Sequence, residues 1–337
     1  MTLINVSEEQ LREWCVDKFK RVGVEEHNAR IAADVLIHAN LRGVDSHGVL
    51  RMEHYITKLT HLGINPNPQL SVLQTGASTA RVDGDDGLGH IVAEKAMSTA
   101  IALAKENGIG AVSAVNSSHC GALSYFVEMA ARQGMIGIAM TNTDKMVVPF
   151  GGSEAYFGTN PIAFGFPAGD ESPVLLDMAT SAVAYGKLLE SMHLGKQIPL
   201  DWAVDAAGQP TADPAKATAL LPFGGPKGYG LGLVVDVFAG LLTGSPFGPY
   251  VPKMYGDDPG EHRKLGHFVC AIDIGRFTDS SSFMANMLRM MEDLHQMQPA
   301  PGFERVMLPG EPEALRKQER LLHGIPLTEE LYRYLQS

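Results

Sequence analysis

The sequence predicts an α/β protein that lacks a Rossmann dinucleotide domain. Helical spacing of apolar residues alternates with short apolar runs through the middle of the chain, which is the pattern of α/β folds. No predicted strand leads into G-x-G-x-x-G, the glycine spacing of the Rossmann nucleotide loop. The 337 residues exceed one typical core, and 45% hydrophobic residues with 36 glycines are typical of a compact, enzyme-like chain.

The beginning of the chain predicts a helical cap. Ser7 and Gln10 have the spacing of a capping box, and apolar residues follow at helical spacing as far as Val22. Two further helices are expected over about 26–41 and about 47–62. The run Asn65-Pro66-Asn67-Pro68 then ends the cap and starts extended chain.

Helices and strands alternate after the cap. Helices are predicted over 89–107, 121–132, 182–194, 228–242 and 280–297, and strands over 109–115, 135–140, 161–166, 174–176 and 267–274. The last of these helices ends at the turn Pro299-Ala300-Pro301-Gly302.

Charge and cysteine usage argue against several classes of protein. The net charge of -11 disfavours a nucleic-acid partner, because phosphate binding requires a positive field. The three cysteines lie far apart without a CxxC pair, so neither a disulfide framework nor a thiolate zinc site is indicated. The chain starts without the apolar run of a signal peptide, and its most apolar segment, 230–242, is too short to span a bilayer. We therefore expect a cytoplasmic protein with no membrane partner.

Residues 43–55 carry the most informative set of reactive groups: the hydroxyl of Ser46, the imidazole of His47, the guanidinium of Arg51 and the phenol of Tyr55. In a helix from about His47, positions 47, 51 and 55 fall near one face. An imidazole transfers protons near neutral pH, and a guanidinium binds a carboxylate with two parallel hydrogen bonds. The set therefore suits a small hydroxy acid. The alternative is a turn in which Ser46 caps the helix and Arg51 is solvated.

His119 follows a predicted strand, and α/β folds commonly display reactive groups at the carboxyl ends of strands. As a general base it would be kept neutral by the N-terminus of the next helix, whereas in a structural role it would cap that helix or bond a buried carbonyl. Cys120 is either a nucleophile or, more commonly for such a residue, a core thiol. Asp45, His47 and His119 are conceivable metal ligands, although no i,i+4 histidine pair is present.

Two further segments suit an anion or a ribose. Residues 222–230, PFGGPKGYG, open an apolar helix, so that free N–H groups, the helix dipole and Lys227 favour phosphate or carboxylate there. Close packing is the alternative use of these glycines. Asp177 ends a strand in LDMAT, where it can accept hydrogen bonds from ribose hydroxyls or cap a helix.

Together these blocks resemble the malate/L-lactate dehydrogenase type 2 family, also called the L-sulfolactate dehydrogenase-like oxidoreductases. The matching blocks cover nearly the whole chain: RGVDSHGVLR, SSHCGA, VPFGG, FGTNPIAF, LDMATS, WAVDAAGQPTADP and LLPFGGPKGYGLGL. Within the family, the blocks SPFGPYVPKMYGDD, RKLGH and PAPGFERVMLPGE are most similar to the ureidoglycolate dehydrogenase branch, whose members oxidise (S)-ureidoglycolate to oxalurate with NAD in allantoin breakdown.

The resemblance implies an α/β fold with a mixed sheet, the non-Rossmann L-sulfolactate dehydrogenase-like fold, with an N-terminal helical cap. It also implies an intertwined homodimer. The expected division is a helical cap with the substrate motif at 1–66, an α/β NAD-binding core at 67–278, and a C-terminal helical segment at 279–337 that packs back on the cap.

The resemblance also implies a role for each matching residue. His119 would accept the substrate hydroxyl proton; other branches give this role to the equivalent of His47, so the choice stays open. Ser46, His47, Arg51 and Tyr55 would line the substrate pocket, with Arg51 on the carboxylate. NAD would contact Thr143, Asp144, Asp177, Met178, Ala179, Lys227, Gly310 and Glu311. No metal ligand is implied. Lys145 stands where the family often has proline, which leaves the substrate and the choice between NAD and NADP open.

Three other functions remain open at this point. The same chemistry could act on malate, lactate or another 2-hydroxy acid. A metal-dependent hydrolase would use Asp45, His47 and His119. A catalytically inactive dimer would bind NAD without turnover.

Overall fold

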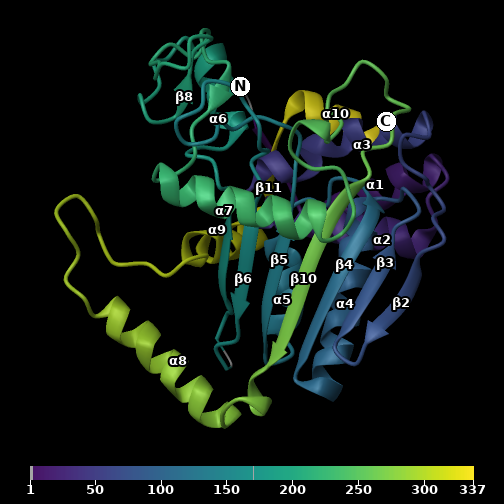
Figure 1. Cartoon of the computed structure of the whole chain (residues 1–337), viewed down its shortest axis with the longest axis vertical. Coiled ribbons are helices and arrows are strands. Elements are labelled where there is room, and N and C mark those ends of the chain that lie inside the picture. Colours follow the sequence, from purple (N-terminus) through teal and green to yellow (C-terminus); the bar gives the residue numbers. More distant parts are fainter. Residues whose placement is uncertain (1–2, 170) are drawn as a thin grey trace.

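The computed structural model describes residues 3–169 and 171–337 and is built around a central mixed sheet (Figure 1). The sheet has 7 strands in the order β2-β3-β4-β10-β5-β6-β7. Only β3 and β4 are parallel neighbours, and the other adjacent strands are antiparallel. The strands are β2 (Ser71–Gly76), β3 (Thr79–Asp83), β4 (Ile109–Ser117), β5 (Met135–Thr141), β6 (Ile162–Phe166), β7 (Val174–Met178) and β10 (Leu265–Asp273). The predicted α/β fold with a mixed sheet is thereby confirmed.

Helices α4 (Gly89–Asn107) and α5 (Ser124–Ala131) cover one face of this sheet. Glycines in the strands allow this close approach. A Cβ on Gly110 would lie 2.0 Å from the carbonyl oxygen of Ala100, and a Cβ on Gly165 would lie 2.5 Å from that of Val127. The helices therefore pack backbone against backbone at these points, where no other residue fits.

Helix α7 (Pro226–Asp236) and the π-helical turn Val237–Leu241 cross the other face. Val235 and Phe238 pack there in a cluster with apolar side chains of four strands: Ile138, Met140, Ile162, Phe164, Met178 and Phe268. Asp236 is buried below them and accepts hydrogen bonds from the Asn142 side chain and the Gly248 backbone. This carboxylate ties α7 to the chain that follows it.

The helical cap contains α1 (Glu8–Arg21), α2 (Glu26–Leu41) and α3 (Met52–Thr60). The third helix starts later than predicted, because two short 3-10 turns, Asp45–His47 and Val49–Arg51, precede it. The side chain of Asn40 explains why the helix begins at a later residue. Its amide accepts from Val49 N at 2.8 Å and donates to Asp45 at 2.6 Å, and it fills the space where a Cβ on Gly48 would lie.

The two ends of the chain meet beside the cap. Strand β1 (Leu3–Val6) pairs antiparallel with β11 (Ile325–Thr328), which leads into α10 (Glu329–Gln336). Helix α9 (Glu311–His323) is joined to the cap by an ion pair from Arg320 to Asp45 at 2.6 Å. The remaining elements are α6 (Tyr185–His193), the short pair β8 (Ala203–Val204) and β9 (Ala219–Leu220), and α8 (Ser280–His295), which stands out at the lower left of Figure 1.

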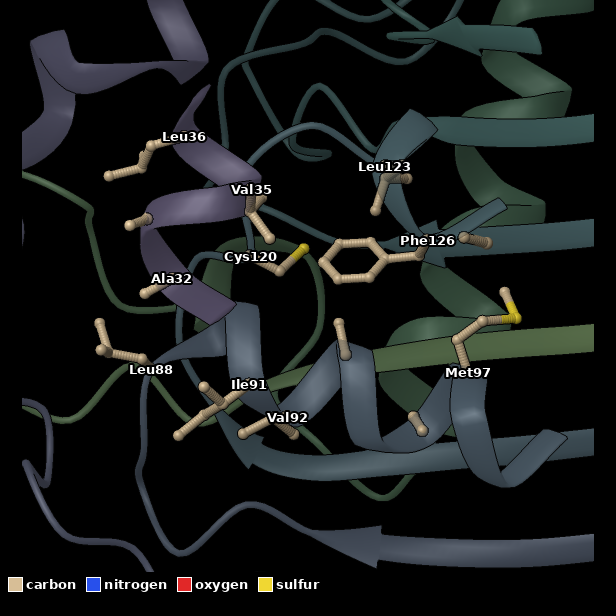
Figure 2. Packing of buried hydrophobic residues seen from close by; sticks show 14 of the residues in the cluster. Ala32, Val35, Leu36, Leu88, Ile91, Val92, Met97, Cys120, Leu123 and Phe126 are labelled. Carbon is tan, nitrogen blue, oxygen red and sulfur yellow. The ribbon is translucent and has the colours of Figure 1, made fainter. Parts of the chain in front are cut away.

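The main apolar core lies between the cap and the sheet. Figure 2 shows side chains of α2 and α4 meeting there with Leu123 and Phe126 of the α5 region, and the sulfur of Cys120 pointing into the same cluster. Across the described ranges 3–169 and 171–337, no helix has the length and apolar character needed to cross a membrane.

Candidate active site

The turn that carries His119 is fixed by polar contacts on both sides. Asn116, at the end of β4, has a left-handed backbone with φ 49, and its side chain donates to Asp83 at 3.0 Å. The Ser118 hydroxyl accepts from Gly89 N at 2.8 Å and donates to Gly87 O at 3.0 Å. Asparagine tolerates the left-handed region better than most residues, so a strained position here directs the turn that follows.

Tyr55 of α3 holds one nitrogen of His119. Its hydroxyl lies 2.6 Å from His119 Nδ1, and the two rings are stacked with their centres 6.1 Å apart. Tyr55 is 0% exposed, and burial raises the pKa of its phenol, which therefore stays neutral. When Nδ1 donates its proton to the phenol oxygen, the other nitrogen, Nε2, carries a lone pair and can accept a proton.

His119 itself is kept neutral. Its pKa lies well below the ordinary value, first because burial disfavours the charged form and then because the His47 imidazole and the guanidinium groups of Arg51 and Arg263 lie nearby. The imidazole is nevertheless partly exposed. His119 is therefore a neutral base that a small ligand can reach.

His47 lies beside His119, with the two ring centres 5.6 Å apart. Its Nδ1 is 3.0 Å from the Ser46 hydroxyl. Burial, with a contribution from Arg51, lowers the pKa of His47 to about 4. The structure thus brings both candidate proton acceptors together, each with one nitrogen bonded to a hydroxyl.

Arg51 completes this group. Its Nε donates to the carbonyl oxygen of Ser46 at 2.7 Å, and a terminal nitrogen donates to the hydroxyl of Tyr255. The four residues named for the substrate pocket, Ser46, His47, Arg51 and Tyr55, are therefore neighbours of one another or of His119. The difference from the expectation concerns Tyr55, which is fully buried behind His119 rather than lining an open pocket.

The proposed metal ligands do not converge. The Asp45 carboxylate is bonded to Arg320 and Asn40. In the part of the chain that the structure describes, no group of three or more His, Cys, Asp or Glu side chains is arranged to hold a metal ion. Cys120 packs in the core (Figure 2), and burial raises the pKa of its thiol to about 12, which suits a core thiol and not a nucleophile.

Asp177, expected to contact the cofactor, lies exposed on β7. One of its oxygens accepts from Ser124 N at 2.7 Å, so Asp177 caps the N-terminus of α5 from a neighbouring element. The turn at Gly310 packs against the same strand, since a Cβ there would lie 2.3 Å from Leu175 O. Two of the predicted cofactor segments therefore lie at β7, and α5 links β7 to the turn of His119.

A network of hydrogen bonds connects Thr143 and α7 to this region. Thr143 Oγ1 accepts from Thr159 N at 2.9 Å, and Thr180 donates to Thr159 O at 3.0 Å. Asn160 donates to Gly232 O of α7 at 2.9 Å. These bonds fix three parts of the chain relative to one another: Thr143, Thr180 after Met178 and Ala179, and helix α7.

Two predicted cofactor residues are already engaged in ion pairs. Asp144 is buried and pairs with the buried Arg263 at 2.5 Å. Glu311 accepts from His295 at 2.8 Å and from Leu308 N at 2.9 Å. By contrast, the side chains of Lys227 and Lys145 are exposed to solvent and accessible to a ligand.

Sequence reasoning did not single out Tyr255 and Arg263, although both lie at the site. They belong to the blocks SPFGPYVPKMYGDD and RKLGH, which carry the family resemblance but imply no role for any of their residues. Neither block has helical or strand periodicity, so only the spatial arrangement reveals that the two residues belong to the site.

Comparisons with known proteins identify a family and several relatives. The malate/L-lactate dehydrogenase family matches residues 6–336. Ureidoglycolate dehydrogenase (NAD(+)) of Escherichia coli is 40% identical over 334 residues, which are 99% of this chain and 95% of that protein. Malate dehydrogenase of Pyrococcus horikoshii is 41% identical over 334 residues, which are 96% and 91% of the two chains. The structure of sulfolactate dehydrogenase from Methanocaldococcus jannaschii matches with a TM-score of 0.93 at 40% identity, covering 98% of this chain and 95% of that one.

Proposed function

We propose that this chain, which belongs to the malate/L-lactate dehydrogenase family, oxidises (S)-ureidoglycolate to oxalurate with NAD as the cofactor. The observation that carries the proposal is the contact between the buried Tyr55 hydroxyl and His119, beside the guanidinium of Arg51. The similarity to the ureidoglycolate dehydrogenase of Escherichia coli supports the choice of substrate.

The residues divide the work of a 2-hydroxy acid oxidation. Arg51 holds the substrate carboxylate through its terminal nitrogens, because a guanidinium and a carboxylate form two parallel hydrogen bonds. The substrate hydroxyl lies at Nε2 of His119, which takes its proton as the carbonyl forms. In the tautomer that this step requires, Nδ1 of His119 donates a hydrogen bond to the Tyr55 hydroxyl, which lies 2.6 Å away and holds the ring in place. Bound NAD supplies the acceptor for the hydride that leaves the carbon.

Substrate binding also changes the charge around His119. Arg51 is one of the groups that lower the pKa of His119. A carboxylate bound to Arg51 offsets this positive charge, so the pKa of His119 rises when the substrate is in place. The base therefore becomes stronger when there is a proton to accept.

The described residues fit a dinucleotide. Exposed Asp177 provides a carboxylate for ribose hydroxyls, and exposed Lys227 provides an ammonium for the negative charge of the cofactor. Thr143 is bonded to Thr159, and Thr180, which follows Met178 and Ala179 in the chain, is bonded to the same residue. In this arrangement Asp144 acts by anchoring Arg263, and Glu311 by fixing the turn that carries Gly310.

A homodimer in the cytoplasm is part of the proposal. Helix α8 buries only Met287 among its residues, while Leu288 and Met290 are 39% and 50% exposed. Phe303, on the chain that follows, is 72% exposed. An apolar arm of this kind suits a second copy of the chain. Light scattering coupled to size exclusion measures the oligomeric state, and a monomer would contradict the dimer.

A second candidate substrate is malate, because the malate dehydrogenase of Pyrococcus horikoshii is as similar to this chain as the ureidoglycolate enzyme. A panel of ureidoglycolate, malate, lactate and sulfolactate, assayed for NADH and NADPH formation, decides between these. We expect the highest kcat/KM for ureidoglycolate with NAD. A higher value for another acid would overturn the substrate proposal. NADH formation that is insensitive to a chelator would exclude the metal-dependent hydrolase.

A further inference from the structure

Tyr255 lies directly against Arg51, the residue proposed to hold the substrate carboxylate. Its hydroxyl accepts a hydrogen bond from a terminal nitrogen of Arg51, and its ring centre is 5.6 Å from the guanidinium carbon. The Tyr255 ring also packs edge to face on His54 of α3, with the ring centres 5.0 Å apart. The phenol therefore touches both the guanidinium and the helix that carries Tyr55.

The segment that carries Tyr255 is anchored on α3. The buried ammonium of Lys58 donates to the carbonyl oxygens of Asp258 at 3.3 Å and Glu261 at 3.2 Å. The backbone at Gly63 is pressed against the same segment, since a Cβ there would lie 2.1 Å from Pro259 O. Carbonyl groups that solvate a buried ammonium are costly to remove, so the segment stays on the helix.

Arg263 anchors the far end of the segment. It donates to Pro252 O at 3.1 Å and forms the buried ion pair with Asp144. Tyr255 is 62% exposed and lies in the chain between Pro252 and Asp258, whose carbonyl groups are both bonded. The contact with Arg51 is therefore made by a held side chain, not by a free loop.

The donors of Arg51 divide into two sets. Nε is committed to Ser46 O, and one terminal N–H is committed to the Tyr255 hydroxyl. Among residues 3–169 and 171–337, the remaining terminal N–H groups of Arg51 have no acceptor, and they suffice for a two-pronged contact with a carboxylate. A guanidinium pinned at both positions loses little conformational freedom when the substrate arrives.

We propose that Tyr255 is a positioning residue that orients the Arg51 guanidinium for the substrate carboxylate. The inference rests on the proposed function, in which Arg51 binds that carboxylate. Tyr255 acts on substrate affinity through Arg51 and takes no part in proton or hydride transfer.

The test replaces Tyr255 by phenylalanine, which keeps the ring over Arg51 and His54 and removes only the hydroxyl. We expect Tyr255→Phe to raise the substrate KM about tenfold, the effect of losing one hydrogen bond to a charged group. We expect kcat to stay within about twofold and NADH affinity to be unchanged, since the cofactor residues are untouched. Tyr250→Phe is the matched control, because Tyr250 lies on the same segment, is 69% exposed and packs on Phe247 instead.

A double-mutant cycle shows whether the effect passes through Arg51. In an Arg51→Lys background, Tyr255→Phe should raise KM no further. An unchanged KM in Tyr255→Phe, a loss confined to kcat, or full additivity with Arg51→Lys would each overturn the inference. If wild type prefers another 2-hydroxy acid, only the substrate proposal is overturned. The KM and kcat of wild type and Tyr255→Phe are then compared with that acid. If wild type oxidises none of them, both proposals fall.

Discussion

The hydrogen bond at Nδ1 of His119 decides whether Nε2 of the same ring can accept a proton. A fully buried phenol at 2.6 Å fixes Nδ1, whereas the corresponding partner of His47 is the partly exposed hydroxyl of Ser46. A buried partner has no water to compete with it, so it holds the imidazole ring in place more firmly than an exposed partner does. This difference favours His119 over His47 as the proton acceptor.

Replacing each histidine by alanine tests this assignment. We expect His119→Ala to lose roughly two to four orders of magnitude in kcat, the usual contribution of a general base, with little change in NADH affinity. His47→Ala should be milder. Thermal melting controls for stability, because His119→Ala leaves the buried Tyr55 hydroxyl without its partner. The opposite ranking in well-folded variants would move the proton acceptor to His47.

The lowered pKa of His119 makes a prediction about pH. The neutral imidazole is the active form, so activity is present above its pKa in the free enzyme and is lost as the pH falls through that value. Because that pKa is lowered well below the ordinary 6.5, kcat/KM should stay flat between pH 8 and pH 6.5 and fall only at lower pH. An acid limb centred at or above pH 6.5 would contradict the neutral, buried base.

At the scale of helices and strands, periodic segments were predictable and aperiodic ones were not. The predicted strands at 109–115 and 267–274 match β4 and β10, and the helix at 280–297 matches α8 to within two residues. The third helix was predicted from His47, which was wrong, because the Asn40 side chain interrupts the backbone there. Apolar spacing carries no information about such a side-chain insertion from a neighbouring helix.

The candidate site follows the same rule. The blocks with His47, Arg51 and His119 were recognisable because their residue types suggest proton transfer and carboxylate binding. The place of Tyr255 depends on Lys58 and Arg263, which anchor the segment through backbone carbonyls and a distant carboxylate. Such contacts leave no pattern in the sequence, and the cofactor contacts remain a prediction.

Helix α7 offers its first turn to an anion. Pro226 has no N–H, and the amides of Gly228 and Tyr229 are bonded to the carbonyls of Phe223 and Gly225. This leaves Lys227 as the main donor of the turn for a ligand. The ammonium therefore matters more, and the free backbone N–H groups less, than the sequence suggested.

Lys227→Ala tests this anion site. We expect NADH to bind roughly ten- to a hundredfold more weakly, as for the loss of a charge-assisted hydrogen bond, and the loss to shrink at high salt. Fluorescence titration with NADH measures it. Lys95→Ala, at an exposed lysine of α4, is the control. Unchanged NADH affinity in a folded Lys227→Ala protein would reject the anion site.

At the scale of the whole molecule, the ends of the chain close around the cap. Strand β1 pairs with β11, and Arg320 of α9 reaches Asp45 beside the substrate motif. Helix α8 belongs to the same C-terminal stretch yet packs on Ala168 and Val174 near the edge strand β7. The division into 1–66, 67–278 and 279–337 stays a prediction, and limited proteolysis would test its boundaries.

Two buried histidines couple the stability of the whole molecule to pH. His267 bridges the hydroxyls of Thr141 and Ser117 in the middle of the sheet, and His90 is 0% exposed with no hydrogen-bond partner for either ring nitrogen among the described residues. Burial lowers the pKa of His90 to about 3 and that of His267 to about 4. Both histidines titrate near 6.5 in the unfolded chain.

Because the pKa values of both histidines are lower in the folded chain than in the unfolded chain, the protein loses stability in acid. Below pH 6.5 the unfolded chain takes up protons that the folded chain does not bind, so the free energy of unfolding is full above pH 6.5 and falls toward pH 4. Each histidine contributes about 1.4 kcal/mol per pH unit in that window. Urea unfolding of wild type and His90→Leu at several pH values isolates one contribution, because His90 has no hydrogen bond to lose. Relative to wild type, the free energy of unfolding of the variant should rise by about 1.4 kcal/mol for each pH unit below pH 6. Parallel stability curves for the two proteins would show that His90 is not held neutral in the core.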